Sequence, residues 1–183
     1  MDGTLTSITT NTASSSSNLT FTSGIDGTYD EYLFLFINLH PASAASDNAF
    51  SFNGSIDGGS NYNVAKTTSF FRAIHTENNA SADVAFGGAF DLHQGTAHQW
   101  LNQNVSADAD GAICGYLHLF QPSSTTFIKH FFARTSPMES SPGAMDCCVG
   151  GYLNTTSAIN AVKFDNHNGH NIDSGIIQMF GVS

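Results

Sequence analysis

Basic residues are scarce in this chain, and their scarcity argues against two kinds of partner. Its 183 residues hold 5 Lys and Arg against 15 Asp and Glu, for a formal net charge of -10. Nucleic-acid binding takes much of its affinity from neutralised phosphates. Adsorption to an anionic membrane needs a basic amphipathic segment, which this sequence lacks. We therefore expect no nucleic acid and no membrane among the partners.

Long apolar runs are missing as well. The longest, Tyr32 to Ile37, has the length of a strand and not that of a membrane span. The amino end, MDGTLTSITTNTASSSS, has neither the basic nor the apolar stretch of a secretory signal. We expect a soluble protein with a polar lead-in over residues 1–16 and a single domain over residues 17–183, because chains of this length seldom divide.

Cysteine is also rare, and its number is odd: Cys114, Cys147 and Cys148. An adjacent pair such as Cys147 and Cys148 seldom bridges to itself, because the ring that it would close is strained. The expected state is free thiols, as in a protein assembled in a reducing cytoplasm.

Polar uncharged residues and strand formers are what the chain has in place of charge. Charged residues make up 11% and apolar residues 40%, against roughly 25% charged in an average soluble protein. Ser, Thr, Asn and Gly fill the difference, while Phe, Thr, Tyr, Val and Ile fill the apolar runs. This composition is common in extracellular and virion β-proteins, and it predicts an all-β fold.

Short apolar or alternating runs recur along the whole chain between turn residues, which is the spacing of a sandwich or barrel. We predict a two-sheet antiparallel sandwich of jelly-roll type with about ten strands. One alternative is a short helix at Asn154 to Asn160. The candidate strands are Asn18–Thr22, Glu31–Leu39, Ala49–Phe52, Thr67–Ile74, Ala82–Leu92, Gln99–Gln103, Ala112–Phe120, Thr126–Arg134, Cys148–Asn154, Ile159–Phe164 and Gly175–Val182.

Turn residues mark several junctions. Asp57-Gly58-Gly59 and Asn168-Gly169 are predicted to be the tips of β-hairpins. Pro122 should end one strand, with the next beginning at Thr126 or Phe127.

Several predicted strands are apolar on both faces. In the strand at 32–37, one face would carry Tyr32, Phe34 and Phe36 and the other Leu33, Leu35 and Ile37. In the strand at 116–120, one face would carry Tyr116, His118 and Phe120 and the other Leu117 and Leu119. In the strand at 127–134, one face would carry Phe127, Lys129, Phe131 and Ala133 and the other Ile128, His130, Phe132 and Arg134. One sandwich core cannot hide all of these rings, so a subunit contact is expected. Cyclic symmetry is the default for a homo-oligomer, and we predict a homotrimer.

Side chains that could carry chemistry are present but poorly grouped. His167 and His170 lack a third metal ligand at a recognised spacing. Cys147 and Cys148, beside Asp146, form no C-x-x-C motif. His118 and His130 are expected on neighbouring strands as hydrogen-bonded imidazoles. No G-x-S-x-G nucleophile motif occurs. We therefore expect no catalytic, cofactor-binding or metal-binding residues, and no enzymatic activity.

The acidic residues are mostly in predicted loops, such as Asp108, Asp110 and Asp146, and Glu occurs only at Glu31, Glu77 and Glu139. A solvated or turn-forming role is expected for these residues. Asp108-Ala-Asp110-Gly111 is an incomplete calcium loop. Ser55, Asp57, Gly59 and Tyr62 match the Asp-box pattern, which stabilises a turn and does no chemistry. Trp100 or Tyr62 could stack on sugars if exposed, although single aromatics more often pack in cores.

Five segments carry a resemblance that extends from about Ser14 to Val182: SSSSNLTFTSGIDGTYDEYLFLFINLHPAS, FSFNGSIDGGSNYNVAKTTSFFRAIHTE, QGTAHQWL, GYLHLFQPSSTTFIKHFFART and GGYLNTTSAINAVKFDNHNGHNIDSGIIQMFGV. The most specific parts are SGID-x-x-Y, Leu-His-Pro, DGGSNY, PSSTTF and NTTSAIN. In these segments the chain resembles a family of virion structural proteins of tailed phages, especially marine and cyanobacterial ones. The chain departs from this family at Met138 to Cys148 and at His167 to His170, which we expect to be surface loops.

The resemblance implies a structural or fibre-like protein and carries no catalytic residue. We expect a component of the virion exterior that assembles in the host cytoplasm, with a capsid decoration or cement protein as the first hypothesis. The alternative is a tail-fibre or receptor-binding component that contacts host surface glycans. A free carbohydrate-binding module and a glycan-cleaving enzyme remain open as further classes.

Overall fold

Two antiparallel β-sheets make up the part of the chain that the structure, a computed structural model, describes: residues 4–43 and 48–183. No helix occurs among these residues, so none could span a membrane. The thirteen strands are β1 (Leu5–Thr12), β2 (Asn18–Phe21), β3 (Glu31–Pro41), β4 (Phe50–Ser55), β5 (Lys66–Thr76), β6 (Ala82–Phe86), β7 (His93–Gly95), β8 (Gln99–Trp100), β9 (Ile113–Phe120), β10 (Lys129–Glu139), β11 (Gly143–Leu153), β12 (Ala161–Asn166) and β13 (Ile172–Val182). The predicted all-β sandwich is confirmed, with more strands than expected.

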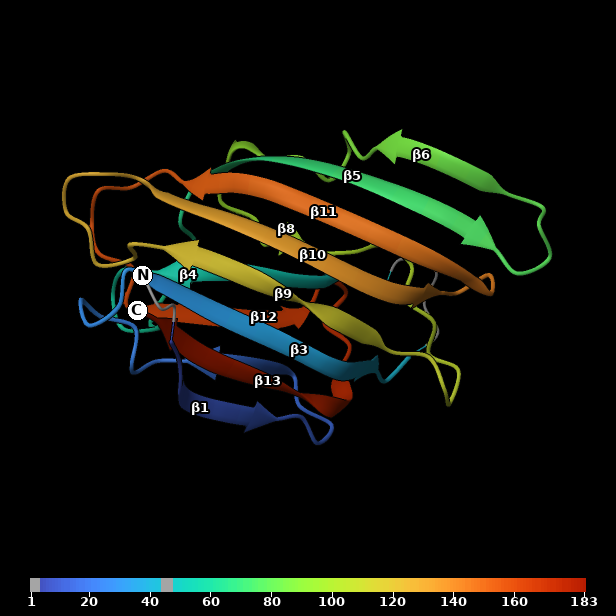
Figure 1. The fold of residues 1–183 in the computed structure, drawn as a ribbon, viewed down its shortest axis with the longest axis horizontal. Coiled ribbons are helices and arrows are strands. Elements are labelled where there is room, and N and C mark those ends of the chain that lie inside the picture. The colour runs from blue at the N-terminus through green and yellow to red at the C-terminus, as the bar shows by residue number, and fades with distance from the viewer. Residues whose placement is uncertain (1–3, 44–47) are drawn as a thin grey trace.

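The two sheets differ in size. The large sheet has nine strands in the order β1-β13-β3-β9-β10-β11-β5-β6, with β7 also paired to β5. The small sheet has four strands in the order β2-β12-β4-β8. In Figure 1, β4 and β12 lie behind the large sheet. This strand order does not confirm the jelly-roll type, which divides eight strands between two sheets.

Aromatic rings fill the space between the sheets. Phe164 of β12 lies near the centre, with five rings around it at centroid distances between 5.3 and 6.2 Å: Phe21, Phe34, Phe36, Phe50 and Phe52. Most of these contacts are edge-to-face or tilted, the arrangements that the ring quadrupole favours. The cluster joins β12 and β4, the two central strands of the small sheet, to β3 of the large sheet.

Two predicted hairpin tips are instead crossings between the sheets. The turn at Asp57 to Gly59 follows β4 of the small sheet and leads to β5 of the large one. The turn at Asn168-Gly169 likewise joins β12 to β13, which belong to different sheets. Gly58, Gly59 and Gly169 do have positive φ, at 71°, 93° and 72°. The turn chemistry was therefore correct, but local sequence does not reveal which sheet the next strand joins.

The stretch from Met138 to Cys148 was predicted to be a surface loop, and that prediction is wrong. β10 continues to Glu139 and β11 begins at Gly143, so only a short tip separates the two strands. Inward side chains alternate through this stretch, and Met145 and Cys147 are buried. The β10–β11 ladder has no pair at Ser136 or Pro137 and resumes at Met138 opposite Ala144, because proline has no N–H to donate.

Three further boundaries differ from expectation. β1 lies within the predicted polar lead-in and pairs with β13, while residues 1–3 of the lead-in are outside the described chain. The strand predicted at Ala82 to Leu92 ends at Phe86, and β10 begins at Lys129 and not at Thr126 or Phe127. Residues 154–160, the alternative helix, form a loop that buries Ile159 in the core.

Candidate interaction surface and polar sites

The large sheet has two apolar faces, and the small sheet covers one of them. In β3 the inward side chains are buried, namely Tyr32, Phe34 and Phe36. The alternate side chains point to the other side of the sheet, namely Leu33, Leu35 and Ile37. We call that side the outer face. The doubly apolar pattern read from the sequence is thus present as two faces of one sheet.

A row of rings crosses the outer face on β9 and β10. Tyr116 meets His118 edge-to-face at 5.1 Å between centroids, and His118 stacks on Phe120 at 6.2 Å. Phe120 contacts Phe132 of β10 at 5.8 Å, and Phe132 is 58% exposed. Leu117 and Leu119, between these residues in sequence, are fully buried on the opposite face. The rings therefore pack on one another but remain open to solvent.

The apolar surface continues to the β6 edge of the sheet. Phe71 of β5 lies opposite Phe86 of β6, with 6.4 Å between ring centroids. Phe71 is 44% exposed, Phe86 84% and Val84 73%. Single exposed apolar residues are ordinary on soluble proteins, whereas a contiguous patch of this kind marks an interaction site.

The charged side chains on the central strands of the outer face have partners within that face. Arg134 of β10 and Asp146 of β11 form a bidentate ion pair, in which Arg134 Nε donates to Asp146 Oδ1 at 2.8 Å and Nη2 donates to Oδ2 at 2.7 Å. Hydrogen bonding to Asp146 raises the pKa of Arg134, and hydrogen bonding from Arg134 lowers the pKa of Asp146. Nearby, His118 Nδ1 is hydrogen-bonded to Glu31 Oε1. Arg134 is therefore not a free cation awaiting an anionic ligand.

The outer face is hollowed between β9, β10, β11 and β5. This open hollow has a volume of about 710 Å³, and Ala73, Tyr116 and Ala144 are among the residues that line it. The Arg134–Asp146 pair also lines it. Its lining is mainly apolar and carries one neutralised ion pair, which suits a protein side chain better than a charged small molecule.

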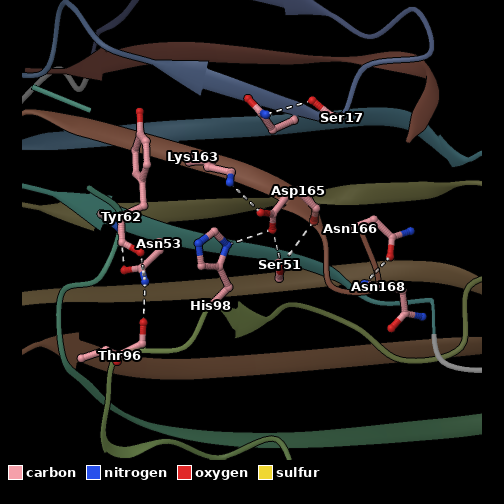
Figure 2. A network of polar contacts seen from close by, with 12 residues as sticks. Ser17, Ser51, Asn53, Tyr62, Thr96, His98, Lys163, Asp165, Asn166 and Asn168 are labelled. Atoms are coloured by element: carbon pink, nitrogen blue, oxygen red, sulfur yellow. Dashed lines mark hydrogen bonds and ion pairs between the residues drawn. The ribbon is translucent and has the colours of Figure 1, made fainter. Parts of the chain in front are cut away.

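A polar network lies on the small sheet around Asp165 of β12. Asp165 Oδ1 accepts from Ser51 Oγ at 2.6 Å and lies 2.8 Å from His98 Nδ1, and Asp165 Oδ2 lies 3.1 Å from Lys163 Nζ (Figure 2). Burial alone would raise the pKa of Asp165, but the hydrogen bonds from His98 and Ser51 bring it below its ordinary value. The carboxylate is therefore held ionised by three donors.

This network contains Ser, His and Asp, but not in the order of a hydrolase triad. In a triad the histidine stands between the serine and the carboxylate and takes the serine proton. Here both Ser51 and His98 contact the carboxylate of Asp165 directly. The arrangement ties β4, β12 and the segment before β8 together, which is a structural role.

A second group of hydrogen bonds fixes the loops beside this network. Asn53 Nδ2 donates to the Tyr62 carbonyl at 2.8 Å and to the Thr96 carbonyl at 3.0 Å (Figure 2). Lys163 Nζ lies 5.9 Å from the centroid of the Tyr62 ring. Tyr62 is thus held against the protein by its backbone and its ring, rather than projecting as a sugar-stacking platform.

The other histidines and cysteines singled out in the sequence form no common site in the described part of the chain. Among the described residues, no group of three or more His, Cys, Asp or Glu side chains is placed to hold a metal ion. His167 packs against Trp100 at 4.3 Å between ring centroids, and His130 against Tyr152 at 5.9 Å. All three cysteines are free thiols, and burial raises the pKa of Cys147 to about 12.

Asp57 and Asp108 form the turns expected of them, whereas Glu31, Glu139 and Asp146 lie in strands β3, β10 and β11 and not in loops. Asp57 accepts hydrogen bonds from Ser55 Oγ at 2.7 Å and from the Asn61 backbone N–H at 2.9 Å, which is the local bonding that the Asp-box pattern predicts. Asp108 accepts from Ser106 Oγ at 2.9 Å, and its carbonyl accepts from Gly111 N–H at 2.7 Å. Both carboxylates are used within their own turns.

Two buried lysines were not anticipated. Lys66 and Lys129 are both fully buried, and each lies opposite Leu153 of β11, on either side of it. Lys66 Nζ donates to the Val64 carbonyl at 2.8 Å, and Lys129 Nζ to the carbonyls of Phe127 and Thr155 at 3.0 Å each. Burial lowers the pKa of Lys66 to about 7 and also lowers that of Lys129. For Lys129 the sequence held a signal, since it shares its strand face with Phe131 and Ala133.

Comparison with known proteins adds no relative: no family model, curated protein or solved structure matches the chain.

Proposed function

We propose that this chain is a non-enzymatic structural protein of the exterior of a tailed-phage particle, and that it acts as a capsid decoration or cement protein. The observation that carries the proposal is the uncovered apolar outer face of the large sheet, with Phe86 84% and Phe132 58% exposed. A patch of this extent on a rigid sheet is suited to permanent contact with other protein surfaces. A cement protein acts by such contacts, because binding to the assembled shell stabilises it by mass action.

Other features support the same proposal. The segments that resemble virion structural proteins of tailed phages run through both sheets, from β2 to β13. The three free thiols suit assembly in a reducing host cytoplasm. The Ser51–His98–Asp165 group, with its non-catalytic order, gives no reason to prefer an enzyme. Copies of the chain would form a homo-oligomer, with the homotrimer as the prediction from sequence.

A tail-fibre or receptor-binding component is the second candidate. One observation favours it: an open hollow of about 500 Å³ is lined by Asp30, Glu31, Phe120, Phe127 and His130, among others, and Phe127 is 64% exposed. An exposed ring beside carboxylates is the combination with which proteins hold sugars, the ring stacking on the sugar and the acids accepting from its hydroxyls. This site would contact host surface glycans.

Cryo-electron microscopy of purified particles that contain the chain would test the proposal. Density for the sandwich over the capsomers is the expected result. Density on the tail, together with glycan binding that Phe127→Ala abolishes, would replace it by the second candidate. Absence of the protein from particles by mass spectrometry, after infection in which the chain is expressed, would refute both.

A further inference from the structure

We propose that the outer face of the large sheet is the surface on which a second copy of this chain docks. The inference rests on the proposed structural function and names the surface through which its subunits meet. Three properties of the outer face carry it: its apolar rows, its extent and its charge.

The apolar rows run across strands and not along a single one. In one row Phe180 of β13, Leu33 of β3, His118 of β9, Phe132 of β10 and Gly150 of β11 follow one another in register. Opposite Phe132 stands Gly150, so the ring has no side chain facing it on that strand. The ring of Phe132 lies over Gly150, since a Cβ added there would stand 3.5 Å from Phe132 Cδ1. The row therefore presents an exposed aromatic face that a ring of an approaching protein can contact.

The extent of the outer face matches that of a stable interface. Six strands from β13 to β5 are about 4.8 Å apart, and eight residues along a strand span about 26 Å, so the face covers roughly 600 to 700 Å². A stable protein interface buries about 800 Å² on each partner. A single docked copy would therefore cover Phe71 and Phe132, whereas Phe86 on β6 and Phe127 before β10 lie outside these six strands.

Charge favours a second copy as the occupant. The chain carries a formal net charge of -10, so two copies repel one another over most of their surfaces. On β10 and β11, however, the outward carboxylate of Asp146 is paired with the Arg134 guanidinium, and on β3 the Glu31 carboxylate is hydrogen-bonded to His118. This is the part of the molecule on which two acidic copies can approach with little repulsion.

The Arg134–Asp146 pair is also complementary to itself. When two outer faces meet in opposite directions, Arg134 of each copy comes against Asp146 of the other, and the four charges can share partners. Both side chains have room to do so, since they are 58% and 41% exposed.

The test is the mass of the protein in solution, measured by light scattering and sedimentation over a range of concentrations. The wild-type chain should be an oligomer at micromolar concentration, and Phe132→Asp should weaken association by about 30-fold or more, as expected for a central aromatic anchor. Ile56→Asp is the matched control, because Ile56 is 46% exposed on the turn after β4. This control should leave the mass unchanged.

A charge exchange provides a second readout with variants that keep the core intact. Arg134→Asp and Asp146→Arg should each shift the protein towards monomer, and the double exchange should restore association. A wild-type monomer, or an oligomer that resists both sets of variants, would overturn the proposal.

The outcomes for this surface are separate from those for the proposed function. An oligomer that dissociates in the outer-face variants supports the surface even if the chain is absent from phage particles, in which case only the virion role fails. A dimer would support the face-to-face contact and replace the predicted trimer, whereas a trimer would contradict it, because one surface that contacts itself closes at two copies.

Discussion

Replacing Lys66 by methionine should stabilise the protein at neutral pH. The ammonium group is fully buried, it donates a hydrogen bond to the Val64 carbonyl, and burial lowers its pKa from 10.5 to about 7. At about 1.4 kcal/mol for each pKa unit, the charged form costs roughly 5 kcal/mol of stability. Methionine has a similar shape and no charge, and loss of the hydrogen bond offsets about 1 to 2 kcal/mol. The expected gain is therefore about 3 kcal/mol.

The pH dependence identifies the cause of this gain. Because the folded pKa of Lys66 is below the unfolded one, the unfolded chain binds more protons between about pH 7 and pH 10.5. Wild-type stability should rise through this window relative to Lys66→Met, and the advantage of the variant should shrink as the pH rises. At and below pH 7 the advantage should be largest.

Urea unfolding of both proteins at pH 6 to pH 10 measures these differences. Lys163→Met is the control, since Lys163 is half-buried and its ammonium lies 3.1 Å from Asp165, so its loss should lower stability slightly. The reasoning is refuted if Lys66→Met is less stable than the wild type at pH 7, or if its advantage does not change with pH.

Two further predictions concern a backbone contact and a thiol. Gly175→Ala should lower the free energy of unfolding by about 1 to 3 kcal/mol, because Gly175 has φ +105° and an added Cβ would meet the Asn38 carbonyl. The control is Gly88→Ala, whose added Cβ enters open space and should change stability little. Thermal unfolding compares the two variants. Native Cys147 should resist alkylation at pH 8 because it is buried with a pKa of about 12, while the exposed Cys114 should react; mass spectrometry after timed labelling would contradict this if both react at one rate.

The inward and outward faces of several strands could be predicted from the sequence, because side chains in a strand point alternately to its two faces and buried positions are apolar. The two faces of Tyr32 to Ile37 and the burial of Leu117 and Leu119 follow from this alternation directly. The pattern of β10 and β11 past Met138 did not stand out, since Pro, Ser and Gly conceal it. β1 was missed for a related reason: it is an edge strand with mostly Thr, Ser and Asn, which look like a linker.

Partner choice between strands could not be predicted, because it depends on contacts distant in sequence. Nothing local to Asp57 or Gly169 shows that the chain crosses to the other sheet there. The same limit applies to Lys66, which lies opposite Leu153 of β11, a residue distant in sequence. The surplus apolar surface, by contrast, was visible in the sequence, and the outer face is where the structure places it.

The pairing of β1 with β13 sets a limit on how the protein can be made. In the large sheet β13 lies between β1 and β3, and Leu5 stands opposite Val182. On a ribosome, β1 and one edge of β3 must therefore stay unpaired until residues 172–182 have emerged. A nascent chain or a truncated fragment that lacks the last strand would carry two unpaired strand edges, and these are templates for aggregation.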